Sequence, residues 1–177
     1  MTTVIYSSFY GSTHDYAAEL AQRLDAELLE LSAAEEPAAL ERLAQESAPL
    51  VVLTPVHGPS VPGAAFVSKH DFSARPVAIA AVGMTLLDVA RDKDQLAGPL
   101  SDKPEVARFY LPGRMNYSEL SSAHSAAMKA VVTALKLKPK KSANERSMIE
   151  LYGKDVDRVD FAELEPIVEW VDAAKQR

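Results

Sequence analysis

Short hydrophobic runs alternate with segments whose hydrophobic residues recur at helical spacing along most of this chain. The runs are rich in Val, Ile, Leu and Ala and carry few charges, which is typical of strands inside a parallel sheet. They predict five strands, at residues 3–6, 26–31, 50–54, 77–82 and 108–111. The other segments predict helices after residue 13 and at 37–45, 63–69, 118–137 and 161–171.

Five alternations of strand and helix predict an α/β fold in which helices cover both faces of a parallel sheet. The second strand carries Glu27 and Glu30, and charges of this kind favour a sheet edge. Pro166 inside the last helix predicts a kink, or a start near Leu164. Residues 88–104 show no clear pattern, and a polar connection is expected between residue 142 and Asp160.

The composition is that of an ordinary globular protein, and it excludes some classes of function. The chain has 177 residues, 47% of them hydrophobic and 25% charged, which suits a single domain spanning 1–177. Its formal net charge of −6 argues against a nucleic-acid-binding surface. The absence of cysteine excludes disulfides and thiolate chemistry. We see no signal peptide and no hydrophobic run long enough to span a bilayer, so we expect a cytoplasmic protein.

Three loops follow predicted strands and should meet at one edge of the sheet, where open α/β sheets bind ligands. They comprise residues 7–13, 55–62 and 83–88. The first loop is rich in hydroxyl groups but has no Lys or Arg, and it lacks the Gly-x4-Gly-Lys arrangement of a triphosphate site. Gly11 stands alone, so a dinucleotide fingerprint is also missing. With triphosphate and dinucleotide sites disfavoured, the loop suits a single phosphate held by backbone N–H groups and hydroxyls. A single phosphate points to a mononucleotide.

The spacing Ser8-x-x-Gly11-x-Thr13 resembles the loop with which flavodoxins bind the phosphate of flavin mononucleotide (FMN). The stretches 54–62 and 82–85 resemble the second and third flavin loops of that family. The resemblance implies a flavodoxin-like three-layer sandwich with five parallel strands in the order 2-1-3-4-5, and FMN as cofactor. It also implies a set of cofactor-binding residues: Ser8, Phe9, Tyr10, Gly11, Ser12, Thr13, Pro55, Val56, His57, Gly58, Gly83, Met84 and Thr85.

Each segment also has a simpler interpretation. Ser and Thr in the first loop favour helix starts in any protein. His57 and Gly58 suit an ordinary turn, and residues 83–85 suit an ordinary connection from strand to helix. The three loops together favour phosphate binding, with Gly58 as the residue whose peptide would meet flavin N5 if the resemblance holds.

The function that the resemblance implies is redox chemistry carried out by FMN. Residues 111–117 and the helix containing Met128 are similar to the branch that includes menaquinone-dependent protoporphyrinogen dehydrogenase. This favours an FMN-dependent oxidoreductase that oxidises protoporphyrinogen IX with a quinone acceptor. In that enzyme we expect the loop at 112–117 to wall the substrate pocket. A flavodoxin-type electron carrier between protein partners and a non-catalytic binding module are the alternatives. The family's carriers often stack Trp or Tyr on the flavin, whereas Trp170 lies in the last helix. The sequence identifies no catalytic residue and leaves the oligomeric state open.

Three further features of the sequence have plain structural interpretations. His124 falls on or beside the hydrophobic face of the helix at 118–137, and we interpret it as a core or boundary residue. The acidic residues between 92 and 102 lack the pattern of a calcium loop, and we predict no metal site. The basic run at 136–141 suits a helix C-terminus, or a patch for anionic lipid or an acidic partner.

Overall fold

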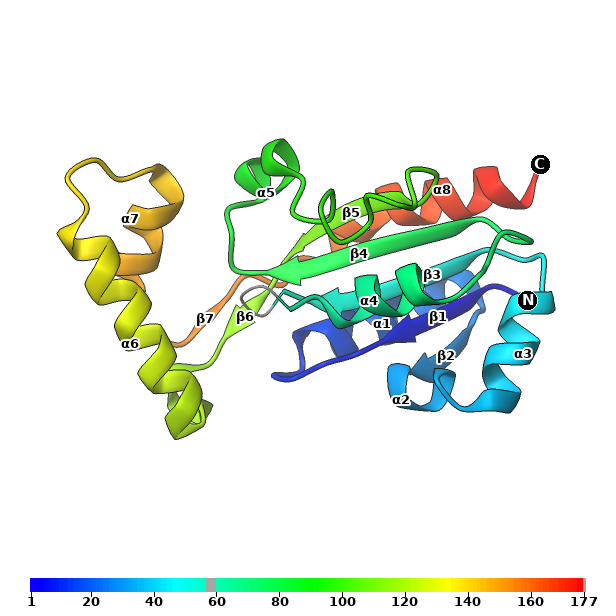
Figure 1. Cartoon of the computed structure of the whole chain (residues 1–177), viewed down its shortest axis with the longest axis horizontal. Coiled ribbons are helices and arrows are strands. Elements are labelled where there is room, and N and C mark those ends of the chain that lie inside the picture. The colour runs from blue at the N-terminus through cyan, green and yellow to red at the C-terminus, as the bar shows by residue number, and fades with distance from the viewer. Residues whose placement is uncertain (57–59, 177) are drawn as a thin grey trace.

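The computed structural model describes residues 1–56 and 60–176 and is built around one parallel sheet (Figure 1). Its strands lie in the order β2-β1-β3-β4-β5. They are β1 (Thr3–Tyr6), β2 (Glu27–Glu30), β3 (Leu50–Pro55), β4 (Val77–Gly83) and β5 (Ala107–Pro112). The predicted strands and their order are confirmed, and β2 lies at the edge as its charges indicated.

Helices cover both faces of the sheet, as predicted. One face packs against α1 (Ser12–Leu24) and α8 (Glu165–Lys175), and its core includes Val51 and Leu53. The other face packs against α2 (Leu31–Ala34), α3 (Pro37–Gln45), α4 (Pro62–Lys69) and α5 (Leu87–Lys93), with Val52 and Ile79 in its core. Side chains of a strand alternate between faces, so consecutive residues of the continuous hydrophobic run in β3 supply both cores.

A close approach between α4 and β3 fixes the position of the second loop. The backbone N–H of Gly63 donates to Thr54 Oγ1 over 2.9 Å, and Thr54 is fully buried. A Cβ at Gly63 would lie 2.8 Å from Val52 Cγ1 and from Thr54 Cβ, closer than real Cβ contacts allow. The absence of a side chain at Gly63 therefore allows α4 to start directly beside the end of β3.

A small lobe is inserted between β5 and α8. It contains β6 (Arg114–Met115), a 3-10 turn η1 (Tyr117–Glu119), α6 (Ser122–Leu137), α7 (Ala143–Glu150) and β7 (Val156–Asp157). Strands β6 and β7 pair antiparallel and carry the two helices beyond the carboxyl ends of the sheet strands (Figure 1).

The lobe corrects two predictions. The helix predicted at 118–137 exists, but it does not cover the sheet; Val132 is its only buried residue and Val131 is 44% exposed. The expected polar connection after residue 142 contains α7, which Ser142 and Glu145 start with a capping box. A hydrophobic pattern at helical spacing predicts a helix but does not show what its apolar face contacts.

The remaining segments agree with the expected pattern or fill its gaps. The patternless stretch 88–104 contains most of α5, and Leu96 and Leu100 after it are fully buried. Pro166 lies in the first turn of α8, which begins at Glu165 after a 3-10 turn η2 (Phe161–Leu164), so the late start is confirmed. Asp160 caps η2 by accepting a hydrogen bond from the N–H of Ala162.

Tyr16 ties α1 to the two ends of the inserted lobe. Its hydroxyl donates to the carbonyl of Pro112 and accepts from the N–H of Asp160, both over 2.8 Å. Burial of the ring raises the pKa of Tyr16 to about 12, so the hydroxyl keeps its proton at neutral pH. No helix in the described part of the chain is long and apolar enough to cross a membrane.

Candidate functional site

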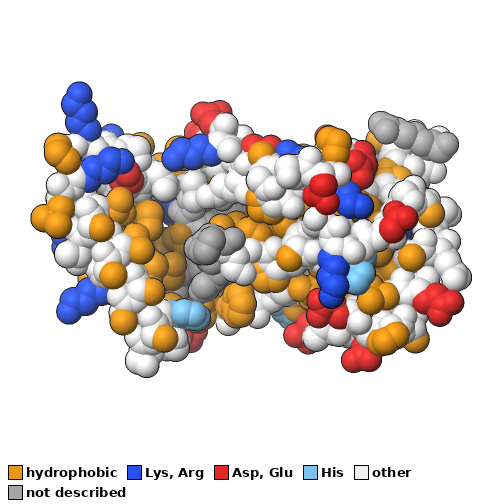
Figure 2. All heavy atoms as spheres, in the orientation of Figure 1, with side chains coloured by type: hydrophobic (Ala, Val, Ile, Leu, Met, Phe, Trp, Pro, Cys, Tyr) orange, Lys and Arg blue, Asp and Glu red, His pale blue; other side chains and the backbone are white. Residues whose placement is uncertain are grey.

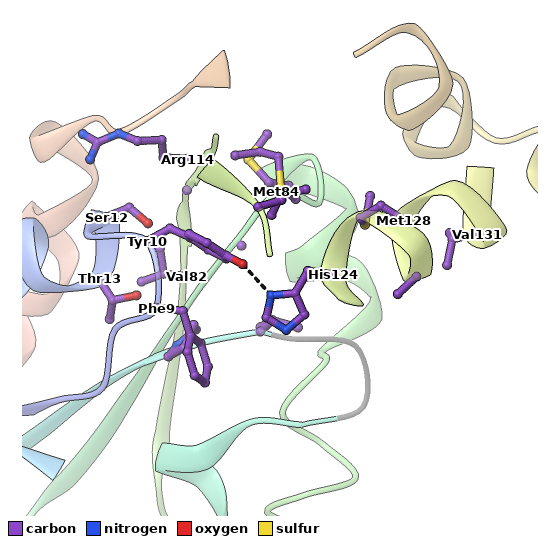
Figure 3. A pocket seen from close by; sticks show the side chains of 17 residues that line it. Phe9, Tyr10, Ser12, Thr13, Val82, Met84, Arg114, His124, Met128 and Val131 are labelled. Carbon is purple, nitrogen blue, oxygen red and sulfur yellow. Dashed lines mark hydrogen bonds between the residues drawn. The ribbon is translucent and has the colours of Figure 1, made fainter. Parts of the chain in front are cut away.

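A cavity of about 340 Å³ lies where the strands end, between the sheet and α6 (Figure 3). Space-filling atoms show a hollow between the two parts of the molecule with hydrophobic side chains around it (Figure 2). The described residues that line the cavity are Phe9, Tyr10, Ser12, Thr13, Pro55, Val56, Val82, Gly83, Met84, Gly113, Arg114, Met115, Leu120, His124, Ala127, Met128 and Val131. The three loops singled out from the sequence therefore meet at one cavity.

The first loop presents polar groups at the start of α1. Gly11 has a φ of +87° and donates its N–H to Ser8 Oγ over 3.1 Å, so these two residues shape the turn but do not line the cavity. No side chain of the described residues caps α1, which leaves the N–H groups of its first turn for solvent or a ligand. Ser7 Oγ is buried and has no hydrogen-bond partner among the described residues.

The second and third loops supply one side of the cavity. Pro55 and Val56 line it, and the N–H of Val56 donates to the carbonyl of Val82 over 2.9 Å. The predicted site residues His57 and Gly58 lie outside the described residues. Gly83 and Met84 line the cavity, but Thr85 does not; its hydroxyl accepts from Gln95 Nε2 over 3.3 Å.

Much of the cavity wall comes from residues outside the predicted cofactor-binding set, including three from the loop at 112–117 that was expected to wall a substrate pocket. Gly113 follows β5 and donates its N–H to the carbonyl of Gly83 over 2.7 Å; a Cβ on Gly113 would lie 3.2 Å from that oxygen. This close approach joins the ends of β4 and β5. Beyond it, Leu120, which lies between η1 and α6, and three residues of α6 present an apolar side to the cavity: Ala127, Met128 and Val131. The helical spacing of these three residues was visible in the sequence, but the sequence did not show that they face a cavity.

His124 is half-buried and hydrogen-bonded, as expected for a boundary residue, but it also belongs to the cavity. It lines the cavity from α6, and its Nδ1 forms a hydrogen bond of 2.5 Å with the hydroxyl of Tyr10 in the first loop (Figure 3). The two rings meet edge to face, with centroids 6.1 Å apart. This contact joins the first loop to the inserted lobe across 114 residues of sequence.

Arg114 brings a positive charge to a loop that has none of its own. Its Nη1 lies 3.1 Å from Asp15 Oδ2 in the first turn of α1, and its Nε lies 2.8 Å from Asp157 Oδ2 on β7. The hydrogen bond to Asp157 is the main cause that raises the pKa of the guanidinium above its ordinary value, with the bond to Asp15 adding to it. The side chain is thus permanently charged and held in place at the cavity.

Methionines concentrate where the lobe meets the sheet. Met84, Met115 and Met128 line the cavity, and together with Met148 they also line a smaller void of about 40 Å³ beneath it. These are four of the five methionines of the chain. Methionine side chains are flexible and polarisable, so they adapt to flat apolar ligands of different shape.

The chemistry of the cavity is divided between its two ends. Hydroxyls, unpaired N–H groups and a guanidinium lie near the start of α1, which suits a phosphate. Hydrophobic side chains and strand ends form the remainder, which suits a flat ring system. The lining has no paired carboxylates or activated nucleophile among its described residues.

A family model described as a flavodoxin domain matches residues 3–142. Among solved structures, a protein from Bacteroides uniformis described as a flavoprotein is similar with 15% identity and a TM-score of 0.42, over 63% of this chain and 90% of its own. The Trp repressor binding protein from Bacillus subtilis is similar with 20% identity and a TM-score of 0.47, over 66% of this chain and 85% of its own. The chain has no match among curated proteins.

Proposed function

Because this chain belongs to the flavodoxin domain family, we propose that it is an FMN-dependent oxidoreductase that takes a second flat molecule between the flavin and α6. The observation that carries the proposal is the single cavity at which all three candidate flavin loops meet the apolar side of α6. When bound, FMN supplies the redox chemistry, since its ring system can accept electrons from one molecule and pass them to another.

The polar end of the cavity fits the phosphate of FMN. The hydroxyls of Ser12 and Thr13 line the cavity at the start of α1, and the first-turn N–H groups have no capping side chain among the described residues. The buried, unpaired Ser7 Oγ lies at the base of the same loop. Ser7 does not itself line the cavity, so the cavity-lining hydroxyl residues and the uncapped N–H groups carry the fit to a phosphate.

The apolar end supports a second flat molecule. Ala127, Met128 and Val131 come from the lobe and not from the sheet, so the cavity continues beyond the flavin loops toward α6. Phe9 lines the cavity and is 57% exposed, so it adds apolar surface there. We propose a porphyrinogen or a quinone as the class of molecule, and protoporphyrinogen IX with a quinone acceptor as the specific pair.

Flavin binding is tested on the full chain. We expect the purified protein to show the visible absorption of oxidised flavin, or to acquire it on titration with FMN at one equivalent per chain. Quenching of flavin fluorescence gives the dissociation constant. A colourless protein that also fails to take up added FMN would contradict the proposal.

The type of redox function needs a separate measurement. We expect the FMN-loaded protein to oxidise protoporphyrinogen IX with menadione as the quinone. If flavin binds but this reaction does not occur, while the protein passes electrons from a flavodoxin reductase to cytochrome c, the electron-carrier function replaces the enzyme. A protein that binds flavin and does neither would be a binding module.

A further inference from the structure

We propose that Arg114 binds the phosphate of the flavin and makes the site selective for FMN over unphosphorylated flavins. The inference rests on the proposed function, because the phosphate belongs to FMN. It concerns a cation that the first loop lacks and that the inserted lobe supplies. Arg114 lies at the base of this lobe, on β6, and reaches back to the start of α1 (Figure 3).

The position of the guanidinium is defined by three observations. Arg114 Nη1 lies 3.6 Å from the point where a Cβ on Gly11 would be, so it lies over the turn that begins α1. The residue lines the cavity together with Ser12 and Thr13. Its side chain is 24% exposed, so it is accessible to a ligand but not freely solvated.

The charges at the start of α1 explain why a phosphate there would need Arg114. Asp15 lies in the first turn of α1, and its carboxylate would repel a phosphate bound at the same helix start. The guanidinium lies against this carboxylate and offsets part of its charge, since it also pairs with Asp157. Arg114 is the only Lys or Arg among the described residues that line the cavity. Among the described lining residues, Arg114 is therefore the one cationic side chain that could bind a phosphate at the start of α1.

Arg114 is also organised before the ligand arrives. Asp15 holds Nη1 and Asp157 holds Nε, which fixes the plane of the guanidinium. Among the described residues, Nη2 has no hydrogen-bond partner and remains available as a donor. A side chain that is already ordered loses little conformational freedom on binding, so more of the interaction appears as affinity.

Through Asp15 and Asp157, Arg114 joins the start of α1 to the base of the lobe. Arg114 and Asp157 face each other in the β6–β7 pair, and Asp15 belongs to α1. A phosphate bound to Arg114 would therefore hold the base of the lobe against the sheet domain. Unphosphorylated flavin would fill the ring site without making this connection.

The test compares FMN with riboflavin in matched variants. Dissociation constants for both flavins are measured by fluorescence titration in the wild type, Arg114→Gln, Arg114→Lys and the control Arg91→Gln. Arg91 pairs with Glu163 at the surface and lies outside the cavity. We expect Arg114→Gln to weaken FMN binding roughly ten- to hundredfold, as for loss of a charged hydrogen bond. Riboflavin binding should change by less than about threefold, which also shows that the variant is folded.

The other two variants separate the effect of the guanidinium shape from that of positive charge in general. Arg114→Lys keeps the charge but loses the planar fork, so we expect an intermediate loss for FMN only. Arg91→Gln should affect neither flavin. Equal losses for FMN and riboflavin, or unchanged FMN binding in Arg114→Gln, would overturn the inference while leaving the proposed function intact. A wild type that binds neither flavin would instead overturn the proposed function, and the inference with it.

Discussion

At the scale of single residues, a small polar cluster around Asp94 supports the segment that the sequence left without a pattern. Asp94 has a φ of +42° at the end of α5, and Arg108 Nη1 lies 2.7 Å from its Oδ2. Tyr110 donates its hydroxyl to the same carboxylate and accepts from the N–H of Leu96 over 3.2 Å. The cluster links β5 to the turn that carries Leu96.

The environment of Asp94 makes stability depend on pH. Partial burial opposes ionisation, but the hydrogen bonds from Tyr110 and Arg108 outweigh it, so the pKa of Asp94 lies below its ordinary value. Burial and the neighbouring Asp94 raise the pKa of Tyr110, which keeps its proton at neutral pH. A carboxylate with a lowered folded-state pKa stabilises the protein above its unfolded-state pKa, near 3.9, and this stabilisation is lost as the pH falls through the folded-state value.

We predict that Asp94→Asn lowers the free energy of unfolding at pH 7 by roughly 0.5–1 kcal/mol, a value that allows for the partial exposure of the carboxylate. Because the variant has no charge to lose, its difference from the wild type should shrink as the pH falls below about 4. Urea unfolding at several pH values measures this. The exposed Asp92→Asn is the matched control and should follow the wild type. A constant difference at all pH values would contradict the prediction.

At the scale of elements, α6 has the hydrophobic pattern of a buried helix, but in the structure it borders α7, the cavity and solvent. Ala127 and Ala130 both lie on its exposed surface, yet only Ala127 lines the cavity. Figure 2 shows further hydrophobic side chains along the outer surface of the lobe. The helix therefore has two apolar sides with different surroundings, and this allows its function to be tested separately from its stability.

We predict that Ala127→Glu weakens the apparent binding of a flat apolar substrate, measured as KM, by at least about tenfold. The added carboxylate would lie in the apolar end of the cavity, where a charge is costly to desolvate. Ala130→Glu is the matched control, since both changes place a good helix former on an exposed position. It should leave KM within about twofold. Equal effects of the two variants on KM would show that α6 does not contact substrate.

At the scale of the whole molecule, the lobe and the sheet domain differ in charge and in packing. Residues 120–154 carry seven Lys or Arg and two Asp or Glu, a formal charge of +5, within a chain of −6. Some of this charge is paired, as in Lys138 with Glu145 over 2.6 Å. The lobe contacts the sheet domain through polar links such as Leu86 N–H to Asn144 Oδ1, over 2.9 Å.

The sparse core of the lobe predicts local opening. Val132 is the only buried residue of α6, and α7 has none, whereas every residue of β3 is buried. Elements with few buried contacts open without unfolding the remainder. We predict that backbone amides of α6 and α7 exchange with deuterium at least about a hundredfold faster than those of β3 and β4. FMN should slow exchange in β6 and β7. Equal protection of α6 and β3 would contradict this prediction.

The sequence by itself determined the sheet, the positions of most helices and the three loops. These follow from local causes: apolar runs form interior strands, helical spacing forms helices, and the hydroxyl-rich segment 7–13 joins the two. The lining residues Ser12, Thr13, Val56 and Gly83 could be predicted because parallel strands bring their carboxyl ends to one edge. His57 and Gly58 stay predictions.

Only the tertiary structure decided which side-chain contacts close the cavity. Arg114 meets Asp15 across 99 residues, and His124 meets Tyr10 across 114, and no local pattern encodes such distances. The apolar spacing of α6 predicted a helix, but a helix can contact a sheet, a partner or a ligand with the same sequence of residues. Its location was set by the β6–β7 pair, whose two strands of two residues each are too short to be recognised before they are paired.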